Sequence, residues 1–254
     1  MRKRTIGLAI AALIAAAGAA WSLWPPAATQ APKPQSPFHD WAVVLVSGDW
    51  RAHSGAPTAV FDNGRRDLAA AFAGIGFSRA NMVQFSVDYD KGTRHTETRA
   101  IADALHETAK KAGGGCLIYV TSHGTPEGIV TGDAVWPPDE FARMVNGDCG
   151  ARPSVVVMSA CYSGQFVAPL QADNRVVITA ARPDRTSFGC GELDRYTYFD
   201  DCFLRAMKLA TDFPGLGDLA RQCVAERESL AGIDEPSEPQ LFVGSGVAYT
   251  LRWR

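Results

Sequence analysis

The stretch Tyr119-Val-Thr-Ser-His123-Gly124, together with Val155-Val-Val-Met-Ser-Ala-Cys161-Tyr-Ser-Gly164, decides the fold that we predict for this chain. Each is an apolar run that ends in small and polar residues, as a buried strand of a parallel sheet does. One run ends at His123 and the other at Cys161. If the two strands are neighbours, an imidazole and a thiol meet at the sheet edge where ligands bind in open α/β folds, which is an arrangement for nucleophilic catalysis.

Strands alternate with helices through the first two thirds of the chain. Apolar runs predict strands at residues 41–47, 82–87, 116–121, 154–160 and 175–180. Helical spacing of apolar side chains predicts helices at residues 65–75, 98–111, 138–146, 198–211 and 216–230. This alternation predicts an α/β fold, a three-layer α-β-α sandwich with a mostly parallel central sheet.

Two smaller elements are predicted outside this alternation. Residues 128–135 read as a small hairpin that turns at Gly132-Asp133, inserted beside the third strand. Residues 241–243 with 247–251 predict a last strand or hairpin.

The composition is that of a globular protein with no polyanionic partner. The chain has 254 residues, of which 46% are hydrophobic and 20% charged, so it can bury a full core. Its formal net charge is -2, and acids and bases are interspersed beyond the first four residues. We therefore expect no nucleic-acid partner.

The N-terminus predicts export. Met1-Arg-Lys-Arg4 precedes an uncharged stretch at residues 5–24, long enough as a helix to cross a bilayer core. The stretch is either a membrane anchor or a cleaved signal peptide, with a buried core helix as a third interpretation. Residues 25–37 form a Pro- and Ala-rich linker, and residues 38–254 form the domain, which lies outside the cytoplasm under either export hypothesis.

The six cysteines suit an exported protein, because disulfides persist outside the cytoplasm. If Cys161 stays reduced, at most two bridges form and one further thiol is left. Cys190 and Cys202 flank one loop and are the first pair that we expect. The alternative is that most cysteines are free, with Cys116 and Cys223 as small buried hydrophobes. No zinc-ligand spacing occurs, so we expect no metal and no cofactor.

The two strand ends supply the parts of an acyl-transfer site. Cys161 is the candidate nucleophile, and His123 is the base that takes its proton or the acid that protonates the leaving amine. Gly124 and Cys161 offer backbone N–H groups for the charge that develops on the carbonyl oxygen. Ser159 and other small residues beside the thiol keep the approach open.

The motifs Ser122-His123-Gly124 and Ser159-Ala-Cys161-Tyr-Ser-Gly164 resemble the His and Cys motifs of the legumain family of cysteine peptidases, within the caspase-like group. That family also includes the catalytic subunit of GPI transamidase. The resemblance runs from about residue 41 to residue 243 and implies a caspase-like fold.

The resemblance implies further site residues. Family members carry an Asn-x-Arg arrangement after the first strand, in which the Asn supports the catalytic His and the Arg binds the P1 side chain. Asn63-Gly64-Arg65 has that form, although the residues that usually separate this Arg from the following Asp are missing. Arg51 and Arg66 therefore compete with Arg65 for the specificity pocket. Asn63 is equally well read as a helix N-cap, and Arg65 and Arg66 as a solvated helix face.

The loop after the fifth strand, residues 184–190, lines the S1 side of the cleft in the resemblance. Asp184 and Ser187 are candidate contacts to a polar P1 side chain, and Ser159 completes the set of substrate-binding candidates. The P1 residue implied is Asn or Asp.

The sequence thus predicts an exported cysteine endopeptidase that acts on peptides or proteins through a thioester acyl-enzyme. A transpeptidase or transamidase with the same Cys-His pair is one alternative, and a catalytically silent caspase-like binding domain is another. Membrane association depends on retention of the N-terminal segment, and the oligomeric state is left open.

Overall fold

The structure is a computed structural model that describes residues 36–88 and 92–254. The anchor and signal-peptide hypotheses, and nearly all of the linker, fall on residues 1–35, which lie outside the described residues. Within the described ranges, no helix combines the length and apolar character that crossing a bilayer requires.

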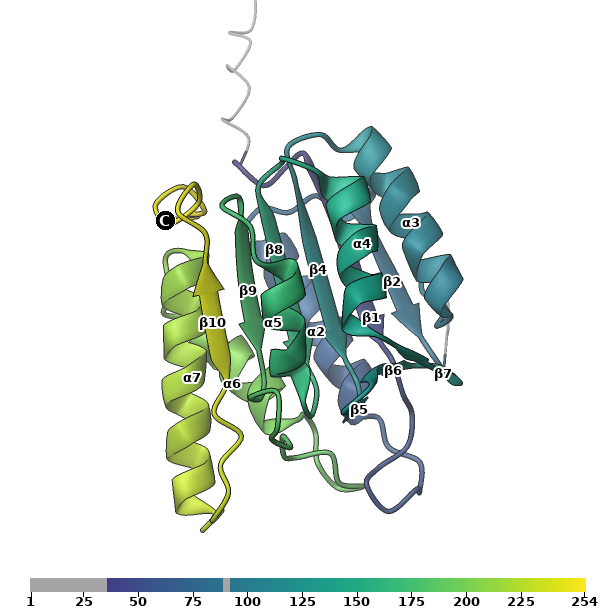
Figure 1. The fold of residues 1–254 in the computed structure, drawn as a ribbon, viewed down its shortest axis with the longest axis vertical. Helices are drawn as coiled ribbons and strands as arrows, with labels where there is room; N and C mark the ends of the chain where they lie inside the picture. Colours follow the sequence, from purple (N-terminus) through teal and green to yellow (C-terminus); the bar gives the residue numbers. More distant parts are fainter. Residues whose placement is uncertain (1–35, 89–91) are drawn as a thin grey trace, which may run out of the picture. The chain divides into compact units, whose positions relative to one another are not determined.

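A seven-stranded sheet forms the middle layer of the domain (Figure 1). Its strands are β1 (Trp41–Ser47), β2 (Met82–Ser86), β3 (Arg94–His95), β4 (Gly115–Thr121), β8 (Ser154–Ser159), β9 (Arg175–Thr179) and β10 (Gln240–Val243). They lie in the order β10-β9-β8-β4-β1-β2-β3, and every neighbouring pair is parallel except β9 with β10. The predicted mostly parallel sheet is confirmed.

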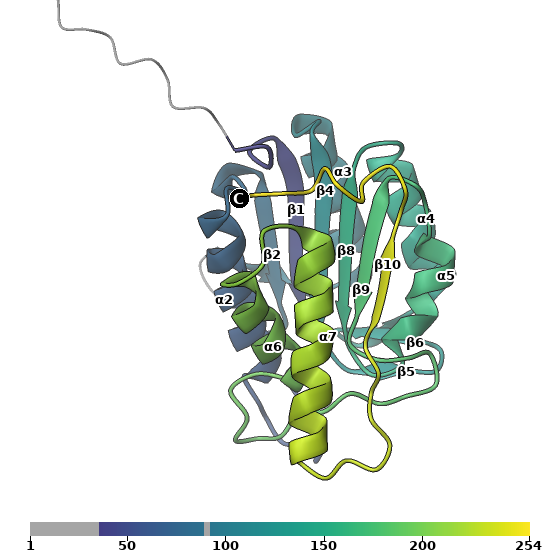
Figure 2. The same ribbon diagram turned by 90° about the vertical axis from the view of Figure 1, so that its left-hand side faces the viewer.

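Helices cover both faces of the sheet (Figures 1 and 2). One face carries α2 (Val60–Gly74), α6 (Tyr198–Met207) and α7 (Phe213–Leu230), and the other carries α3 (Thr98–Lys111), α4 (Pro138–Cys149) and the short α5 (Val167–Leu170). Strand side chains alternate between these layers, so that Val43 and Leu45 enter one core and Val44 and Val46 the other. Both faces of each central strand are buried, which explains the continuous apolar runs in the sequence.

A small antiparallel sheet follows β4. It consists of β5 (Gly124–Thr125), β6 (Gly128–Thr131) and β7 (Ala134–Trp136). The predicted hairpin is therefore present, and Gly132 at its turn has φ of 66°, a left-handed conformation that favours glycine.

The described residues also contain two short 3₁₀ segments, and some element boundaries differ from those predicted. The 3₁₀ segments are Arg79–Asn81 before β2 and Ser163–Phe166 before α5. The helix predicted to end at residue 211 ends at Met207, and residues 245–250 are turns rather than the second strand of a hairpin.

The N-cap interpretation of Asn63 is wrong. Helix α2 begins at Val60, with Ala59 at the N-cap position, and the Asn63 N–H already donates to the Ala59 carbonyl at 2.8 Å. The hydroxyl of Thr58 accepts from the Val60 N–H at 3.3 Å, so a threonine just before the helix satisfies its first free donor.

Two disulfides join neighbouring layers or helices, and neither is the predicted pair. Cys116 in β4 bonds Cys149 at the end of α4, and Cys202 in α6 bonds Cys223 in α7. The expected bridge from Cys190 to Cys202 is absent because Cys202 faces the adjacent helix rather than the loop. Cys161 and Cys190 remain as thiols, as the limit of two bridges required.

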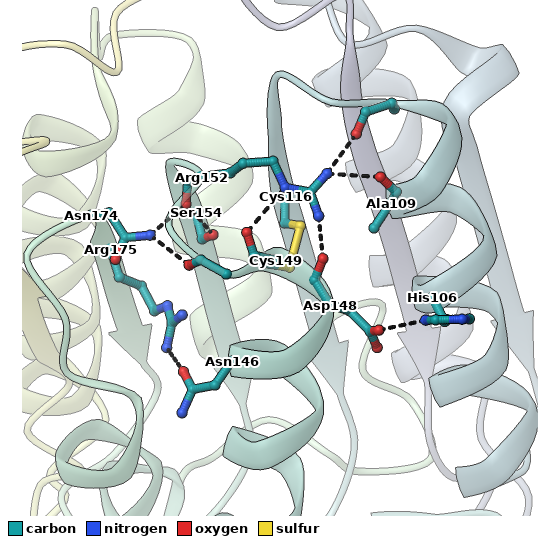
Figure 3. Close-up of a disulfide and its surroundings, with 12 residues drawn as sticks. His106, Ala109, Cys116, Asn146, Asp148, Cys149, Arg152, Ser154, Asn174 and Arg175 are labelled. Atoms are coloured by element: carbon teal, nitrogen blue, oxygen red, sulfur yellow. Dashed lines mark hydrogen bonds and ion pairs between the residues drawn. A yellow bond between two sulfur atoms is a disulfide. The ribbon is translucent and has the colours of Figure 1, made fainter.

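Arg152 caps two helices beside the first disulfide (Figure 3). Its guanidinium donates to the carbonyls of Ala109 at 2.8 Å and Ala112 at 3.1 Å, at the end of α3. It also donates to the carbonyls of Asp148 and of Cys149, the latter at 3.0 Å, at the end of α4. One side chain thus satisfies helix-terminal acceptors that have no partner within their helices.

Asp200, in the first turn of α6, is a fully buried carboxylate. The hydroxyls of Tyr119 and Thr121 in β4 donate to its two oxygens at 2.7 and 2.6 Å. Burial raises the pKa of Asp200 above the usual aspartate range, and the hydroxyl donors oppose that rise.

We predict that Arg152→Met lowers the free energy of unfolding by about 1–3 kcal/mol, because several partly buried carbonyls lose their donor. Urea denaturation of the disulfide-intact protein measures the loss. Arg99→Met is the control, because Arg99 is 87% exposed and its ion pair with Asp103 is long, at 3.9 Å. Equal stability of the two variants would contradict the capping role.

We also predict that the stability of the wild type falls relative to Asp200→Asn as the pH rises from about 4 towards neutrality. A raised pKa means that the native state holds the Asp200 proton more tightly than the unfolded chain does. The advantage is present at low pH and is lost as the pH rises through the native pKa. Urea denaturation of both proteins at several pH values measures this difference, and a difference in unfolding free energy that is the same at every pH would refute the prediction.

Candidate active site

The ends of β4 and β8 lie side by side at the carboxyl edge of the sheet. The strands are parallel neighbours with Thr121 opposite Ser159, and the Ser122 N–H donates to the Ser159 carbonyl at 3.0 Å. His123 and Cys161 each follow two residues later. The topology therefore brings the two sequence motifs to one place, as the order of the strands predicted.

Gly124 packs against the backbone of Cys161. A Cβ atom at Gly124 would lie only 2.0 Å from the Cys161 carbonyl oxygen, a distance that real Cβ atoms do not show. The chain leaving His123 therefore touches the chain at Cys161, and only glycine permits this approach.

A sharp turn presents Cys161 at the rim of the sheet. Tyr162 adopts φ of 56° and ψ of 11°, a left-handed conformation that is unfavourable for a tyrosine. The turn is held by the Tyr162 N–H, which donates to the Arg185 carbonyl at 2.7 Å, and by the Ser163 hydroxyl, which accepts from the Ala181 N–H at 3.1 Å. Cys161 is left half-buried, and its thiol forms no disulfide.

Ser187 contacts the thiol directly. Its N–H donates to Cys161 Sγ at 3.2 Å, and its hydroxyl and carbonyl oxygens lie 3.6 Å from the same sulfur. The sequence predicts that Ser187 contacts the P1 side chain, and the structure places it on the thiol of Cys161. An N–H donor at this position stabilises the negative charge of a thiolate.

His123 is oriented by a backbone carbonyl. Its Nε2 lies 2.8 Å from the Arg51 oxygen, and since a carbonyl only accepts, Nε2 carries the hydrogen in this bond. Nδ1 is then the basic nitrogen of the neutral ring. The ring of Phe61 packs edge-on against the imidazole, with centroids 5.0 Å apart.

Arg51 had been a candidate for the P1 pocket, and its side chain is paired with Asp49. Nε and Nη2 donate to the two Asp49 oxygens at 2.9 and 3.2 Å. The bonds and charge of Asp49 raise the pKa of the guanidinium. Asp49 also accepts the N–H groups of Trp50 and Arg51, which fixes the loop whose carbonyl holds His123.

Asn63 does not take the supporting position expected beside His123. Its amide donates to the Arg195 carbonyl at 3.1 Å and accepts from Arg66, so no hydrogen bond between Asn63 and His123 exists among the described residues. The Arg51 carbonyl occupies that position instead. No side-chain pattern marks a carbonyl, so sequence reasoning could not find this group.

Arg65 is turned away from the site. It is 5% exposed and donates to Asp62 at 2.9 Å and to Gln84 of β2 at 2.5 Å. Arg65 therefore joins α2 to the sheet, and a pocket role would require it to leave both partners.

The other two candidate substrate-binding residues, Asp184 and Ser159, differ in exposure. Asp184 is exposed and forms a bidentate pair with Arg182, whose hydrogen bonds lower the pKa of that carboxyl. Ser159 is buried beneath the thiol, with its hydroxyl 3.4 Å from that of Thr197.

Two loops close over this edge of the sheet. The β1–α2 loop (residues 48–59) and the β9–α6 loop (residues 180–197) are joined by a bond from the His53 N–H to the Cys190 carbonyl, at 3.2 Å. Thr58 donates to the Gly191 carbonyl at 3.2 Å, and Ser54 donates to Glu192. Burial, followed by the charge of Cys161, raises the pKa of the Cys190 thiol.

A cavity of about 570 Å³ adjoins the β1–α2 loop on its far side from β4. Four carboxylates line it, from Asp49, Asp62, Asp88 and Glu192. Across residues 36–88 and 92–254, however, no three His, Cys, Asp or Glu side chains are grouped as metal ligands.

Comparisons with known proteins agree with this geometry. The model of the Peptidase C13 family matches residues 101–218, just under half of the chain, and the match includes both His123 and Cys161. The structure of caspase-1 from Spodoptera frugiperda superposes with a TM-score of 0.61 at 15% identity, covering 87% of this chain and 93% of that one. No curated protein sequence matches the chain.

At this identity the superposition shows the fold alone, and the family match adds the type of chemistry. Together they support a function of the cysteine-peptidase type. The chain has a caspase-like α/β fold, and over residues 101–218 it matches the Peptidase C13 family, the legumain family, as its two motifs indicated.

Proposed function

We propose that this protein is a cysteine endopeptidase of legumain-like type that cleaves peptides after asparagine or aspartate. The observation that carries the proposal is the contact between Gly124 and the Cys161 backbone, which joins the free thiol to the segment bearing His123. The motif match and the orientation of His123 by the Arg51 carbonyl support the same chemistry.

In the proposed reaction, Cys161 gives its proton to His123 and its sulfur attacks the carbonyl carbon of the scissile peptide. The N–H groups of Gly124 and Cys161 receive the negative oxygen of the tetrahedral intermediate. The C–N bond then breaks, and His123 returns the proton to the leaving amine. Water attacks the thioester, releases the carboxylic acid and restores the thiol.

The charges around Arg51 favour asparagine over aspartate at P1. Two guanidinium N–H groups are taken by Asp49, while those on Nη1 have no part in that pair. The remaining donors suit a carboxamide oxygen, whereas the pair as a whole carries no net charge to attract a carboxylate. Ser187 is the other proposed contact, because Ser159 is buried and Asp184 and Arg65 are paired with other residues.

We also propose that the protein acts outside the cytoplasm, attached to the membrane if its N-terminal segment is retained. Two disulfides in the described part of the domain support this compartment, because such bonds persist where the medium is oxidising.

Cleavage of a peptide library tests catalysis and specificity together. A peptide library incubated with the purified protein is expected to be cleaved after Asn faster than after Asp at neutral pH. An acyloxymethyl ketone probe with Asn at P1 is expected to label Cys161, and Cys161→Ala should show neither activity. A wild type that is neither labelled nor active would end the peptidase proposal.

The same assay separates hydrolysis from transpeptidation when a peptide amine is added. We expect the free carboxylic acid to remain the main product, and a predominant amide product would identify a transpeptidase instead.

Substitution of Gly124 tests the close contact between the His123 and Cys161 segments. Gly124→Ala places a methyl group against the Cys161 carbonyl, so the backbone at His123 or Cys161 must move. We expect kcat/KM to fall about a hundredfold, because a displacement of about 1 Å in a catalytic site has an effect of that order. Gly147→Ala is the matched control, because Gly147 lies in α4 with nothing within 4 Å of an added Cβ. Unchanged activity of Gly124→Ala would contradict the site geometry.

A further inference from the structure

The buried carboxylate of Asp200 has no part in the reaction described above, yet it lies directly beneath the site. It is 0% exposed, and its own N–H donates to the Thr197 hydroxyl at 3.0 Å, which caps α6. A buried carboxylate is costly unless it is fully hydrogen-bonded, so its retention needs a reason.

Asp200 is hydrogen-bonded to the end of β4, and through Thr197 it lies next to the end of β8. On the β4 side, Thr121 donates to it at 2.6 Å, two residues before His123. On the β8 side, Ser159 lies two residues before Cys161. The Ser159 hydroxyl also lies 3.4 Å from that of Thr197, the cap of the helix that carries Asp200.

Helix α2 rests on the same carboxylate. A Cβ atom at Gly64 would lie 2.5 Å from Asp200 Oδ2, so the helix approaches more closely than any other residue would allow. One turn earlier, Phe61 of α2 packs against the His123 ring. The three elements that surround the imidazole and the thiol therefore meet at one carboxylate.

We propose that Asp200 is a positioning residue, which holds the ends of β4 and β8 and the start of α2 so that His123 and Cys161 keep their reactive geometry. The inference rests on the proposed function and extends it. The Ser122 N–H donates to the Ser159 carbonyl at the end of the paired region, and the chains then continue into β5 on one side and the turn at Tyr162 on the other, with Gly124 packed against Cys161. The hydroxyl bonds from Tyr119 and Thr121 to Asp200 hold β4 just before this point.

The test compares conservative changes at both ends of one hydrogen bond. Thr121→Val keeps the shape of the side chain and removes its donor, Thr121→Ser keeps the donor, and Asp200→Asn keeps the shape and removes an acceptor. Thr108→Val is the matched control, because Thr108 is a buried threonine of α3 on the other face of the sheet.

Two measurements on the purified full-length protein separate positioning from stability. The first is peptide hydrolysis, in which Thr121→Val and Asp200→Asn are expected to lower kcat about tenfold or more, with KM changed less than about twofold. The second is the rate at which iodoacetamide alkylates Cys161, which needs no substrate. We expect it to change in both variants, to return to the wild-type value in Thr121→Ser, and to be unaffected by Thr108→Val.

The outcomes are distinguishable. If Thr121→Val and Asp200→Asn fold and keep wild-type kcat and alkylation rates, Asp200 is structural only and the inference is overturned. If kcat falls in Thr121→Ser as much as in Thr121→Val, the hydrogen bond is not the cause and the inference again fails. If the wild type cleaves no peptide but the alkylation rates still follow the expected pattern, the positioning role stands and the peptidase proposal does not.

Discussion

The register between β4 and β8 is the constraint on which the rest of the structure depends. Pairing Thr121 with Ser159 brings the two strands to an end at the same level, so that His123 and Cys161 emerge together. A shift of one residue would turn every side chain of a strand to the opposite core. The register that buries the apolar side chains therefore also brings His123 and Cys161 to the same level of the sheet.

Much of the site is made of backbone rather than side chains. The Arg51 carbonyl orients His123, and the Ser187 N–H donates to the thiol. The proposed oxyanion contacts are also N–H groups. Such groups are positioned by loops that are themselves pinned, as Asp49 pins the β1–α2 loop through its bonds to Trp50 and Arg51. Substituting Asp49 is therefore expected to change the position of the Arg51 carbonyl and so the orientation of His123.

The two edges of the sheet have different tasks. At the amino edge, Arg152 and the disulfide from Cys116 to Cys149 tie the ends of α3 and α4 to the sheet, away from the reacting groups (Figure 3). At the carboxyl edge, the chain adopts a left-handed tyrosine and buries Asp200, both of which cost stability.

By itself the sequence determined the α/β class, most strands and helices, the hairpin after His123 and the placement of His123 and Cys161 at one edge of the sheet. Apolar runs and turn residues are local signals, and a strand followed by a reactive residue is readable without coordinates. Tertiary structure alone decided the hydrogen-bond partners of His123, Asn63 and Arg65 and the pairing of the two disulfides. Those outcomes depend on distances between segments far apart in the chain, and a backbone carbonyl leaves no mark in an amino-acid sequence.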